Sequence, residues 1–425
     1  MDISSKSAIL KSVERSKTTK GATMKYIVLL CDGMADFSIG ELNGKTPMAT
    51  AKKPTMDALA PFSVLGMAKT VPDGYKPGSD VANLSAMGFD PKTCYTGRSP
   101  LEAVSIGIDM KEQDVAFRCN LVTLSDEDEY SDKTMVDYSS SEITTEEAAK
   151  LIKAIAKELN DEERVFYSGI SYRHCMIWEH GPVGLNLTPP HDISDQKITD
   201  YIPENPIIYS LMKKSYDILK NHPINLDRIK RGLHPANSIW LWGEGTKPSI
   251  PNFYDMYHVD GTVISAVDLI KGIGLAAGMD VPDNASWTGN IHTNFRSKAD
   301  TAIKALLSDG KDFVYIHVES ADECGHQGLL AEKIESIEKI DQHILSPLIE
   351  ALAEAQEEYS ILIMPDHPTP IALKTHTSDP VPFMLYRSNE NEDQHTGSFH
   401  EVNCSLSGVY IDPAHELMKI LLQQD

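Results

Sequence analysis

An aspartate and a histidine stand four residues apart just after a hydrophobic run that is typical of a buried strand. Asp322 and His326 follow the run 313–318, and in a tight turn both side chains can face one metal ion. Asp366 and His367 form a second acid–imidazole pair after another such run. Mixed carboxylate and imidazole ligands suit manganese, zinc or magnesium-like ions better than copper(I) or an iron–sulfur cluster. The sequence therefore predicts a metal site at strand ends.

Asp32 and His376 extend this set of ligands. Asp32 follows the hydrophobic run 26–31, and His376 lies in a loop after Asp366. With them the chain offers three carboxylates and three imidazoles, which are enough for two divalent ions. Any one of these residues alone is more often a turn former or a satisfied loop residue. The prediction therefore depends on their joint occurrence at three strand ends.

A serine in the segment 77–85 is placed where a nucleophile could act. Gly78 allows a sharp turn, and the apolar spacing after Ser79 predicts a helix that begins there. The positive end of a helix dipole stabilises an oxyanion or a phosphate. A serine alkoxide needs more help than a dipole, and a metal ion can supply it. The alternative is that Ser79 only caps the helix.

Four cationic or imidazole side chains could hold an anion. They are Arg118, Arg173, His191 and Lys298. An arginine can bind a carboxylate or a phosphate through two parallel hydrogen bonds. The alternative for each of them is an ordinary surface charge.

The elements that must position these residues alternate as in an α/β fold. The runs that predict buried parallel strands are 26–31, 313–318 and 361–364. Each delivers a carboxylate just past its end, which indicates one sheet with one active edge. Leu329–Gln356 has helical spacing that Pro347 should break or kink. Ser297 is expected to cap a helix over 298–307, and Val263–Gly278 is expected to be helical.

The middle of the chain has a different pattern. Thr144 and Glu147 form a capping box for a helix. Short strand-like runs flank it at 115–124, 164–167, 175–178 and 238–242. We expect a smaller α+β domain over 111–247, inserted into an α/β domain made of 24–110 and 248–425.

Composition excludes several classes of protein. The 425 residues carry 39 Lys+Arg against 62 Asp+Glu, a net charge of −23, which argues against a nucleic-acid partner. The six cysteines form no C-x-x-C pair, as expected of reduced thiols in the cytoplasm. No apolar run reaches the ~18 residues of a membrane span. Residues 1–23 are interpreted as a flexible extension rather than a secretory signal.

A series of motifs covers nearly the whole chain after residue 23. They are Cys31–Asp36, Thr46–Ala51, Gly78–Ala82, Tyr95–Ala103, Ala116–Leu121, Pro190–Ile193, Thr288–Gly289, Asp322–His326 and Pro365–Pro370. In this order they resemble the cofactor-independent phosphoglycerate mutases of the archaeal type, within the alkaline phosphatase superfamily. The resemblance implies an alkaline-phosphatase-like α/β/α sandwich with a mostly parallel sheet and an inserted α+β domain that closes over the site.

The resemblance also implies an activity. It is the interconversion of 3-phosphoglycerate and 2-phosphoglycerate through a phosphoserine, without 2,3-bisphosphoglycerate. Two divalent ions are expected as cofactors, manganese first, with zinc, magnesium or cobalt as alternatives. The expected partner is a small phosphorylated substrate, neither a nucleic acid nor a membrane. The resemblance leaves open whether the chain forms a homo-oligomer.

The resemblance also implies roles for individual residues, at the positions where the motifs match. Ser79 is expected to be both nucleophile and metal ligand. Asp32, Asp366 and His367 are expected to share its metal ion, and Asp322, His326 and His376 to hold the second one. The residues expected to bind the substrate are Arg118, Asn120, Arg173, His191 and Lys298, with Asp192 as a general acid or base.

One position departs from the family's pattern. Trp242 stands where the family has an arginine, so one anion contact is lost and specificity for phosphoglycerate is in question. A phosphatase or phosphomutase acting on another substrate is one alternative. A homoserine kinase, proposed for sequences with this variation, is another. The glycine-rich segments Gly40–Thr46 and Gly272–Gly278 have neither the spacing nor the context of an ATP or dinucleotide site.

Overall fold

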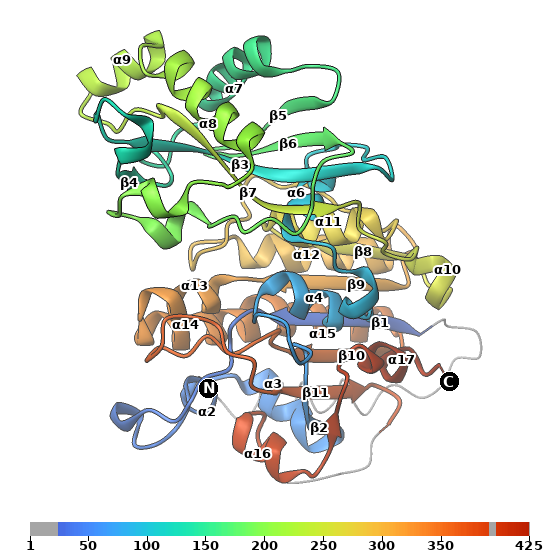
Figure 1. Cartoon of the computed structure of the whole chain (residues 1–425). Helices are drawn as coiled ribbons and strands as arrows, with labels where there is room; N and C mark the ends of the chain where they lie inside the picture. Colours follow the sequence, from blue (N-terminus) through green and yellow to red (C-terminus); the bar gives the residue numbers. More distant parts are fainter. Residues whose placement is uncertain (1–23, 391–396, 425) are drawn as a thin grey trace. The chain divides into compact units, whose positions relative to one another are not determined.

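The computed structural model describes residues 24–390 and 397–424, which form two compact units (Figure 1). The first unit comprises the described residues up to Tyr95 and from Ile250 onward. The inserted unit is the continuous segment Thr96–Ser249. The extension expected over 1–23 lies outside the described residues.

The first unit is built on a seven-stranded sheet with the order β12-β2-β11-β10-β1-β9-β8. Its strands are β1 (Lys25–Cys31), β2 (Ser63–Ala68), β8 (Gly261–Ile264), β9 (Phe313–Val318), β10 (Tyr359–Met364), β11 (Val381–Arg387) and β12 (Tyr410–Ile411). β11 runs antiparallel to β2 and β10, and the other neighbouring pairs are parallel. The expected sandwich with a mostly parallel sheet is confirmed.

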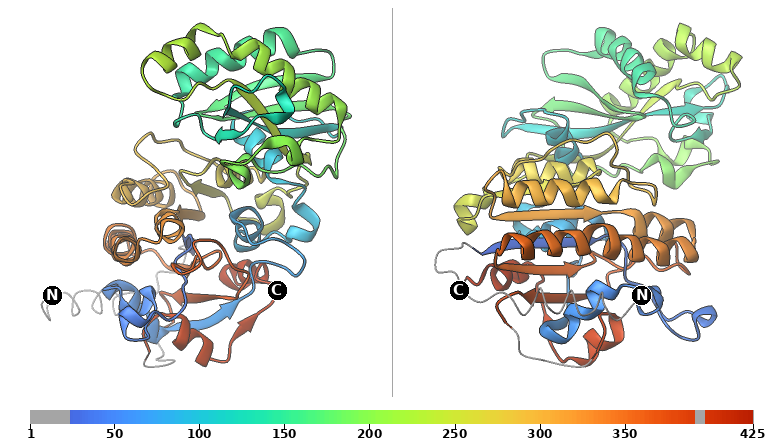
Figure 2. Two further views of the ribbon diagram at one scale, coloured as in Figure 1. Left: turned by 60° about the vertical axis from the view of Figure 1, so that its left-hand side comes forward. Right: turned by 180° about the vertical axis from the view of Figure 1, so that it is seen from behind.

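Helices cover both faces of this sheet. They are α2 (Pro47–Thr50), α3 (Pro54–Leu59), α4 (Ser79–Ala86), α5 (Pro91–Cys94), α10 (Phe253–Tyr257), α11 (Asp268–Ala276), α12 (Phe295–Leu307), α13 (Ser320–Gln327), α14 (Leu330–Ile340), α15 (Ser346–Ala355), α16 (Glu401–Leu406) and α17 (Glu416–Leu422). α12, α14 and α15 lie on one face, and α4, α11 and α17 lie on the other (Figure 2).

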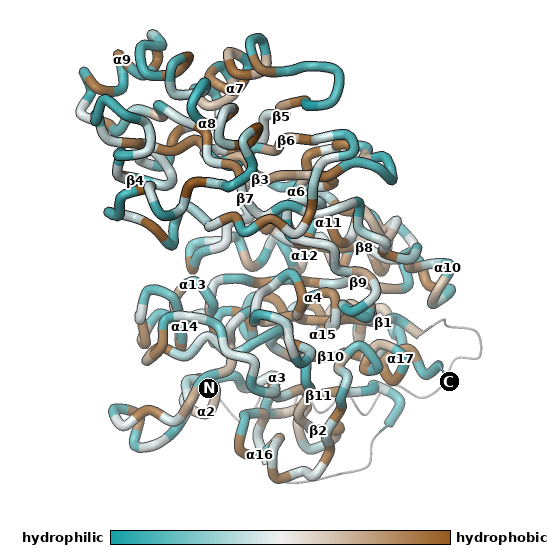
Figure 3. Tube along the Cα trace, in the orientation of Figure 1, coloured by the Kyte–Doolittle hydropathy of each residue, from teal (hydrophilic) through white to brown (hydrophobic). Residues whose placement is uncertain are grey.

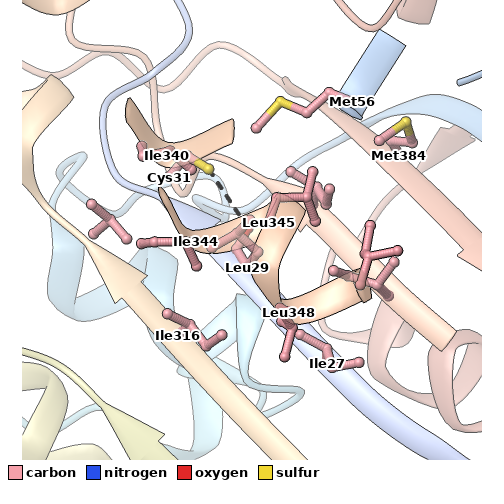
Figure 4. Packing of buried hydrophobic residues seen from close by; sticks show 14 of the residues in the cluster. Ile27, Leu29, Cys31, Met56, Ile316, Ile340, Ile344, Leu345, Leu348 and Met384 are labelled. Carbon is pink, nitrogen blue, oxygen red and sulfur yellow. Dashed lines mark hydrogen bonds between the residues drawn. The ribbon is translucent and has the colours of Figure 1, made fainter. Parts of the chain in front are cut away.

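The hydrophobic core of the first unit lies between the central strands and the helices. Ile27, Leu29 and Ile316 are fully buried and pack with Leu348 of α15 (Figure 4). Burial of one such side chain contributes about 1.5–3 kcal/mol. Helices such as α7 carry both hydrophobic and hydrophilic segments, as expected of elements with one buried face (Figure 3). This core makes the sheet edge that carries the site rigid.

The segment expected to be a long helix over Leu329–Gln356 is helical from Leu330 to Ala355, and a π-helical turn just before Pro347 stands where a break or kink was expected. α14 ends at Ile340 and α15 begins at Ser346, with one π-helical turn at Asp341–Leu345 between them. Pro347 lies in the first turn of α15, directly after the π-helical turn, where the backbone hydrogen-bond pattern of the helix is already altered.

Two other helix predictions were wrong in their boundaries. α12 begins at Phe295, because Asn294 rather than Ser297 is its cap; the Asn294 side chain accepts a hydrogen bond from Ser297 N at 3.0 Å. Residues 263–264 belong to β8, and α11 begins only at Asp268. β8 is buried along its whole length, and a short apolar run of this kind cannot be told from a buried helix by its periodicity.

The inserted unit is an antiparallel sheet with helices on both faces. Its strands are β3 (Asp114–Leu124), β4 (Met135–Asp137), β5 (Arg164–Ile170), β6 (Arg173–Glu179) and β7 (Ser238–Thr246), and its helices are α6 (Arg98–Ser105), α7 (Thr145–Leu159), α8 (Pro206–Leu219) and α9 (Pro223–Lys230). β3 pairs with both β6 and β7. The Thr144 cap predicted for α7 is confirmed, because its side chain accepts a hydrogen bond from Glu147 N.

Candidate active site

The acids of the predicted site gather at the carboxyl edge of the central strands. β1 is in parallel register with β9 and β10, so Asp32 and Asp366 follow neighbouring strand ends. Asp322 and His326 lie in α13, one helical turn apart, rather than in the expected tight turn. The helical spacing places both side chains on one face, which suits a shared ligand as well as a turn would.

The first group of ligand atoms surrounds the His367 imidazole. Its Nε2 lies 3.3 Å from Asp366 Oδ2, 3.8 Å from Asp32 Oδ1 and 3.2 Å from Ser79 Oγ. Asp32, Asp366 and His367 each offer one ligand atom, and these atoms all lie within 4.8 Å of one another. The structure thus brings together the four residues predicted for the first metal ion.

Ser79 is the first residue of α4, and Gly78 is the cap. The alternative that Ser79 serves only as a helix cap is therefore wrong. Its hydroxyl instead contacts the His367 imidazole at the positive end of the helix dipole. This position favours a negatively charged oxygen on Ser79 or on a group bound to it.

A hydrogen-bond network holds Asp366 in place. Asn83 Nδ2 donates to Asp366 Oδ2 at 2.8 Å, and Tyr315 OH donates to Asn83 Oδ1 at 2.7 Å. The backbone N–H groups of Gly33 and His367 donate to the other oxygen, at 3.2 and 2.8 Å. The sequence interpretation missed Asn83, although it lies one helical turn after the serine and on the same face.

The second group joins α13 to the loop after β10. The Nε2 atoms of His326 and His376 are 2.8 Å apart, and each lies 3.3 Å from an oxygen of Asp322. His326 Nδ1 donates to the carbonyl oxygen of Lys374 at 3.0 Å, which leaves Nε2 as the ligand atom when the ring is neutral. The Thr369 hydroxyl donates to Asp322. Two imidazole nitrogens directed at one carboxylate suit a divalent cation.

The electrostatic surroundings of Asp32 favour the binding of a cation next to its carboxylate. Asp32 is 1% exposed, and its Oδ1 has no hydrogen-bond partner. Burial, followed by the charges of Asp366 and Asp322, raises the pKa of Asp32 well above its usual value. A buried, unpartnered carboxylate oxygen among other acids is costly without a positive charge. The donor set therefore fits divalent ions. Glu319, which the sequence interpretation did not assign, forms a third group with Asp32 and Asp322.

Three of the residues expected to bind the substrate meet in the inserted unit. Arg118 and Asn120 lie two residues apart on β3, so both point to one face of the sheet. The Arg118 guanidinium lies 4.9 Å from the centre of the Trp242 ring, and Trp242 Nε1 donates to Asn120 Oδ1 at 3.1 Å. The His191 ring lies 5.6 Å from the same indole. Arg173 pairs with Asn120 across β3 and β6.

Glu102 of α6 balances this positive charge. Its Oε1 accepts a hydrogen bond from Arg118 at 2.9 Å and one from Arg98 at 2.9 Å. Burial alone would raise the pKa of Glu102, but the Arg118 and Arg98 charges lower it below its usual value. Burial lowers the pKa of Arg118 to about 10, so the guanidinium keeps its charge at neutral pH. Sequence inspection could not find Glu102, because only the packing of α6 on β3 brings it to Arg118.

Lys298 and Asp192 have different surroundings. Lys298 is 1% exposed in α12 of the first unit, and its Nζ donates to the carbonyl oxygen of His317 at 2.7 Å. Burial lowers the pKa of Lys298 to about 7. Asp192 is exposed, and its Oδ1 lies 3.6 Å from His191 Nε2. Lys298 thus lies in the first unit, whereas Arg118, Asn120 and His191 lie in the inserted unit.

The fold and the site together define a class of protein. A serine at a helix N-terminus, next to carboxylate and imidazole groups at the carboxyl edge of a parallel sheet, is the arrangement of a phosphoryl-transfer enzyme. A family model described as 2,3-bisphosphoglycerate-independent phosphoglycerate mutase matches residues 60–225.

Relatives extend this match to nearly the whole chain. The chain is 45% identical, over 94% of its length and 100% of the relative's, to a probable 2,3-bisphosphoglycerate-independent phosphoglycerate mutase from Geobacter sulfurreducens. A 2,3-bisphosphoglycerate-independent phosphoglycerate mutase from Methanosarcina barkeri matches with the same identity and coverage. The chain therefore belongs to the family of 2,3-bisphosphoglycerate-independent phosphoglycerate mutases.

Two solved structures share the fold of this chain. The PH0037 protein from Pyrococcus horikoshii superposes with a TM-score of 0.76 at 28% identity, covering 95% of this chain and 98% of that one. The cofactor-independent phosphoglycerate mutase from Thermoplasma acidophilum shares the fold, with a TM-score of 0.63 at 24% identity and coverage of 94% and 99%.

Proposed function

We propose that this chain interconverts 3-phosphoglycerate and 2-phosphoglycerate without 2,3-bisphosphoglycerate, through a phosphoserine at Ser79. The contact that carries the proposal is the one between the Ser79 hydroxyl and His367 Nε2, 3.2 Å long, at the N-terminus of α4. Family membership supports the same activity. The hydroxyl contacts His367 of the first group of ligand residues, where a nucleophile for phosphoryl transfer could be activated.

The reaction consists of two displacements. In the first, Ser79 Oγ loses its proton and attacks phosphorus, the bond from phosphorus to the glycerate oxygen breaks, and that oxygen takes up a proton. In the second, the other hydroxyl of glycerate loses its proton and attacks the phosphoserine, the bond from phosphorus to Ser79 Oγ breaks, and Ser79 Oγ takes up a proton. Two in-line displacements give overall retention of configuration at phosphorus, which a chiral phosphate substrate would reveal.

Two divalent ions complete the site, with manganese as the first candidate. Asp32, Ser79, Asp366 and His367 would hold one, and Asp322, His326 and His376 would hold the other. Such ions lower the pKa of a bound hydroxyl and neutralise the charge that develops on the transferred phosphoryl group. The unpartnered Oδ1 of Asp32 and the paired imidazoles of the second group support this assignment.

We assign substrate binding to the inserted unit. Arg118, Asn120 and His191 form a cluster around Trp242, and Arg173 lies on the neighbouring strand. A bound glycerate must stay in place until the second displacement, since its loss to water would make the enzyme a phosphatase. Asp192, beside His191, is proposed as the acid or base for the glycerate hydroxyls.

One assay tests the proposal. The protein is supplied with 3-phosphoglycerate and manganese, without bisphosphoglycerate or ATP, and 2-phosphoglycerate is detected by coupling to enolase. Formation of 2-phosphoglycerate is the expected result. Inorganic phosphate as the main product would indicate a phosphatase. No product here, together with phosphorylation of homoserine by ATP, would overturn the proposal in favour of a kinase.

We also place the enzyme in the cytoplasm. All six cysteines are free and buried, which is expected of a reducing compartment. Among the described residues, no helix has both the length and the apolar character needed to cross a bilayer.

A further inference from the structure

A buried histidine that no part of the proposed reaction uses lies directly behind Asp32. His317 is on β9, is fully buried, and places its Nε2 3.0 Å from Asp32 Oδ2. On the other side of the ring, Nδ1 lies 3.2 Å from the hydroxyl of Ser265. Ser265 follows β8, the neighbouring strand, and is fully buried as well. Ser265, His317 and Asp32 thus form a hydrogen-bonded row that ends at the site.

The direction of these hydrogen bonds follows from the chemistry of the three groups. An ionised carboxylate only accepts, so the His317 ring must donate to Asp32 through Nε2–H. A neutral ring then has an unprotonated Nδ1, which can only accept. Ser265 Oγ already accepts from Val267 N at 3.0 Å, and its own hydrogen is free to donate to Nδ1. In this arrangement every polar side-chain atom of the row has a partner except Asp32 Oδ1.

The row leaves one oxygen of Asp32 for the site. Oδ2 is engaged by His317, whereas Oδ1 has no partner and lies 3.8 Å from His367 Nε2. Lys298 adds to the rigidity of the row, because its Nζ donates to the carbonyl oxygen of His317.

We propose that His317 is a positioning residue that holds Asp32 as a ligand through Oδ1 alone, and that the Ser265 hydroxyl selects the tautomer of His317 that can do so. The inference rests on the proposed function, because it takes Asp32 as a metal ligand. In this role His317 acts on the reaction only through Asp32.

Two substitutions of His317 by amide side chains of different length test the proposal. The amide of His317→Gln can reach Asp32 in place of Nε2–H, whereas the shorter amide of His317→Asn cannot. Binding of manganese is measured on the full chain by competition with a chromogenic chelator. We expect wild type to bind in two steps and His317→Asn to lose 10–100-fold in affinity in one of them. His317→Gln should recover most of that affinity, and the other step should not change.

A matched serine pair separates positioning from general damage to the core. Ser265→Ala removes the hydroxyl behind His317 and should weaken the same binding step. Ser215→Ala is the control, because Ser215 is equally buried and accepts from Ile239 N at 2.9 Å, but lies in the inserted unit. It should leave both steps unchanged.

A second measurement uses the wild-type protein, so it does not require any variant to fold. In protein with ¹⁵N-labelled histidine loaded with zinc, the His317 ring should give the NMR pattern of the tautomer protonated at Nε2. A ring protonated at Nδ1 would overturn the inference, and so would an unchanged affinity in His317→Asn. Wild-type protein that binds no divalent ion would overturn the proposed function and this inference with it. Two-step binding in wild type, unaffected in His317→Asn, would overturn this inference alone.

Discussion

Trp242 shows how one side chain can change the surroundings of an anion-binding group. An arginine at this position would add a positive charge, whereas the indole supports the charges already there. It stacks below the Arg118 guanidinium and donates to Asn120, so it orients two residues that we assign to the substrate. An ordered guanidinium needs less rearrangement on binding, which favours affinity.

Replacement of the indole should therefore weaken substrate binding. Trp242→Phe keeps an aromatic face but loses the Nε1–H donor, a hydrogen bond worth about 1 kcal/mol, or about a fivefold change in KM. We expect KM for 3-phosphoglycerate to rise by about that factor, with a smaller change in kcat. Trp178→Phe is the control, because the Arg164 guanidinium lies 5.0 Å from the Trp178 ring in the same unit. Equal KM values for the two variants would contradict this role of Trp242.

Helix ends position several of the groups that matter here. α4 begins at Ser79, and α13 places Asp322 and His326 one turn apart. In the inserted unit the first turn of α7 carries Glu147, which contacts both Arg228 of α9 and Arg231. Arg228 is 1% exposed, so this ion pair ties α9 to α7 through a buried charge.

Stability should depend on this contact in a pH-dependent way. Burial opposes the charge of Glu147, but hydrogen bonds from Arg231 and Arg228 outweigh it and lower its pKa. The contribution is therefore present above the usual pKa of about 4.3 and is lost as the pH falls through the lower value in the folded protein. We expect Glu147→Gln to lower the free energy of unfolding by about 1 kcal/mol at pH 7, a modest figure because the carboxylate is partly solvated.

Urea unfolding of wild type and Glu147→Gln at pH 7 and at successively lower pH measures this effect. The difference between them should shrink as the pH falls below the usual pKa. Glu146→Gln is the control, since the neighbouring Glu146 is exposed and contacts only Lys150 among the described ion pairs. A difference between wild type and Glu147→Gln that stays constant with pH would contradict the expectation.

Local patterns predicted those features of the elements that depend on neighbouring residues. Hydrophobic runs followed by Asp32 and Asp366 located the strand ends, because parallel strands must end at one edge of their sheet. The roles of Glu102 and Trp242 could not be found in this way, because they depend on how α6 and β7 pack against Arg118 of β3. The Asn294 cap was missed because Ser297, three residues later, is also a good capping residue type.

The net charge of −23 is compatible with an anionic substrate when the whole molecule is considered. Three of its acids, Asp32, Asp322 and Asp366, are assigned to metal ions. Two divalent ions would bring four positive charges against these three carboxylates, so the local field at the site becomes positive. In the inserted unit, the Arg118 guanidinium beside Trp242 is a further positive charge.

Removal of metal should abolish turnover without unfolding the protein. The large core around β1 and α15 does not include the ligand residues, so folding does not depend on the ions. We expect EDTA to eliminate activity while the circular dichroism spectrum in the far ultraviolet is retained, and manganese to restore activity. Full activity in EDTA would contradict the metal assignment. Loss of the spectrum would contradict the expectation that folding does not depend on the ions.

The most direct test is whether Ser79 carries the phosphoryl group during turnover. Wild-type protein with manganese and ³²P-labelled 3-phosphoglycerate is quenched in acid and digested, and the labelled peptide is identified by mass spectrometry. The label should reside on Ser79, and Ser79→Ala should show neither label nor turnover. Ser85→Ala, in the same helix with its hydroxyl bonded to the carbonyl oxygen of Thr70, should keep both. Turnover by Ser79→Ala at the wild-type rate would contradict the phosphoserine mechanism.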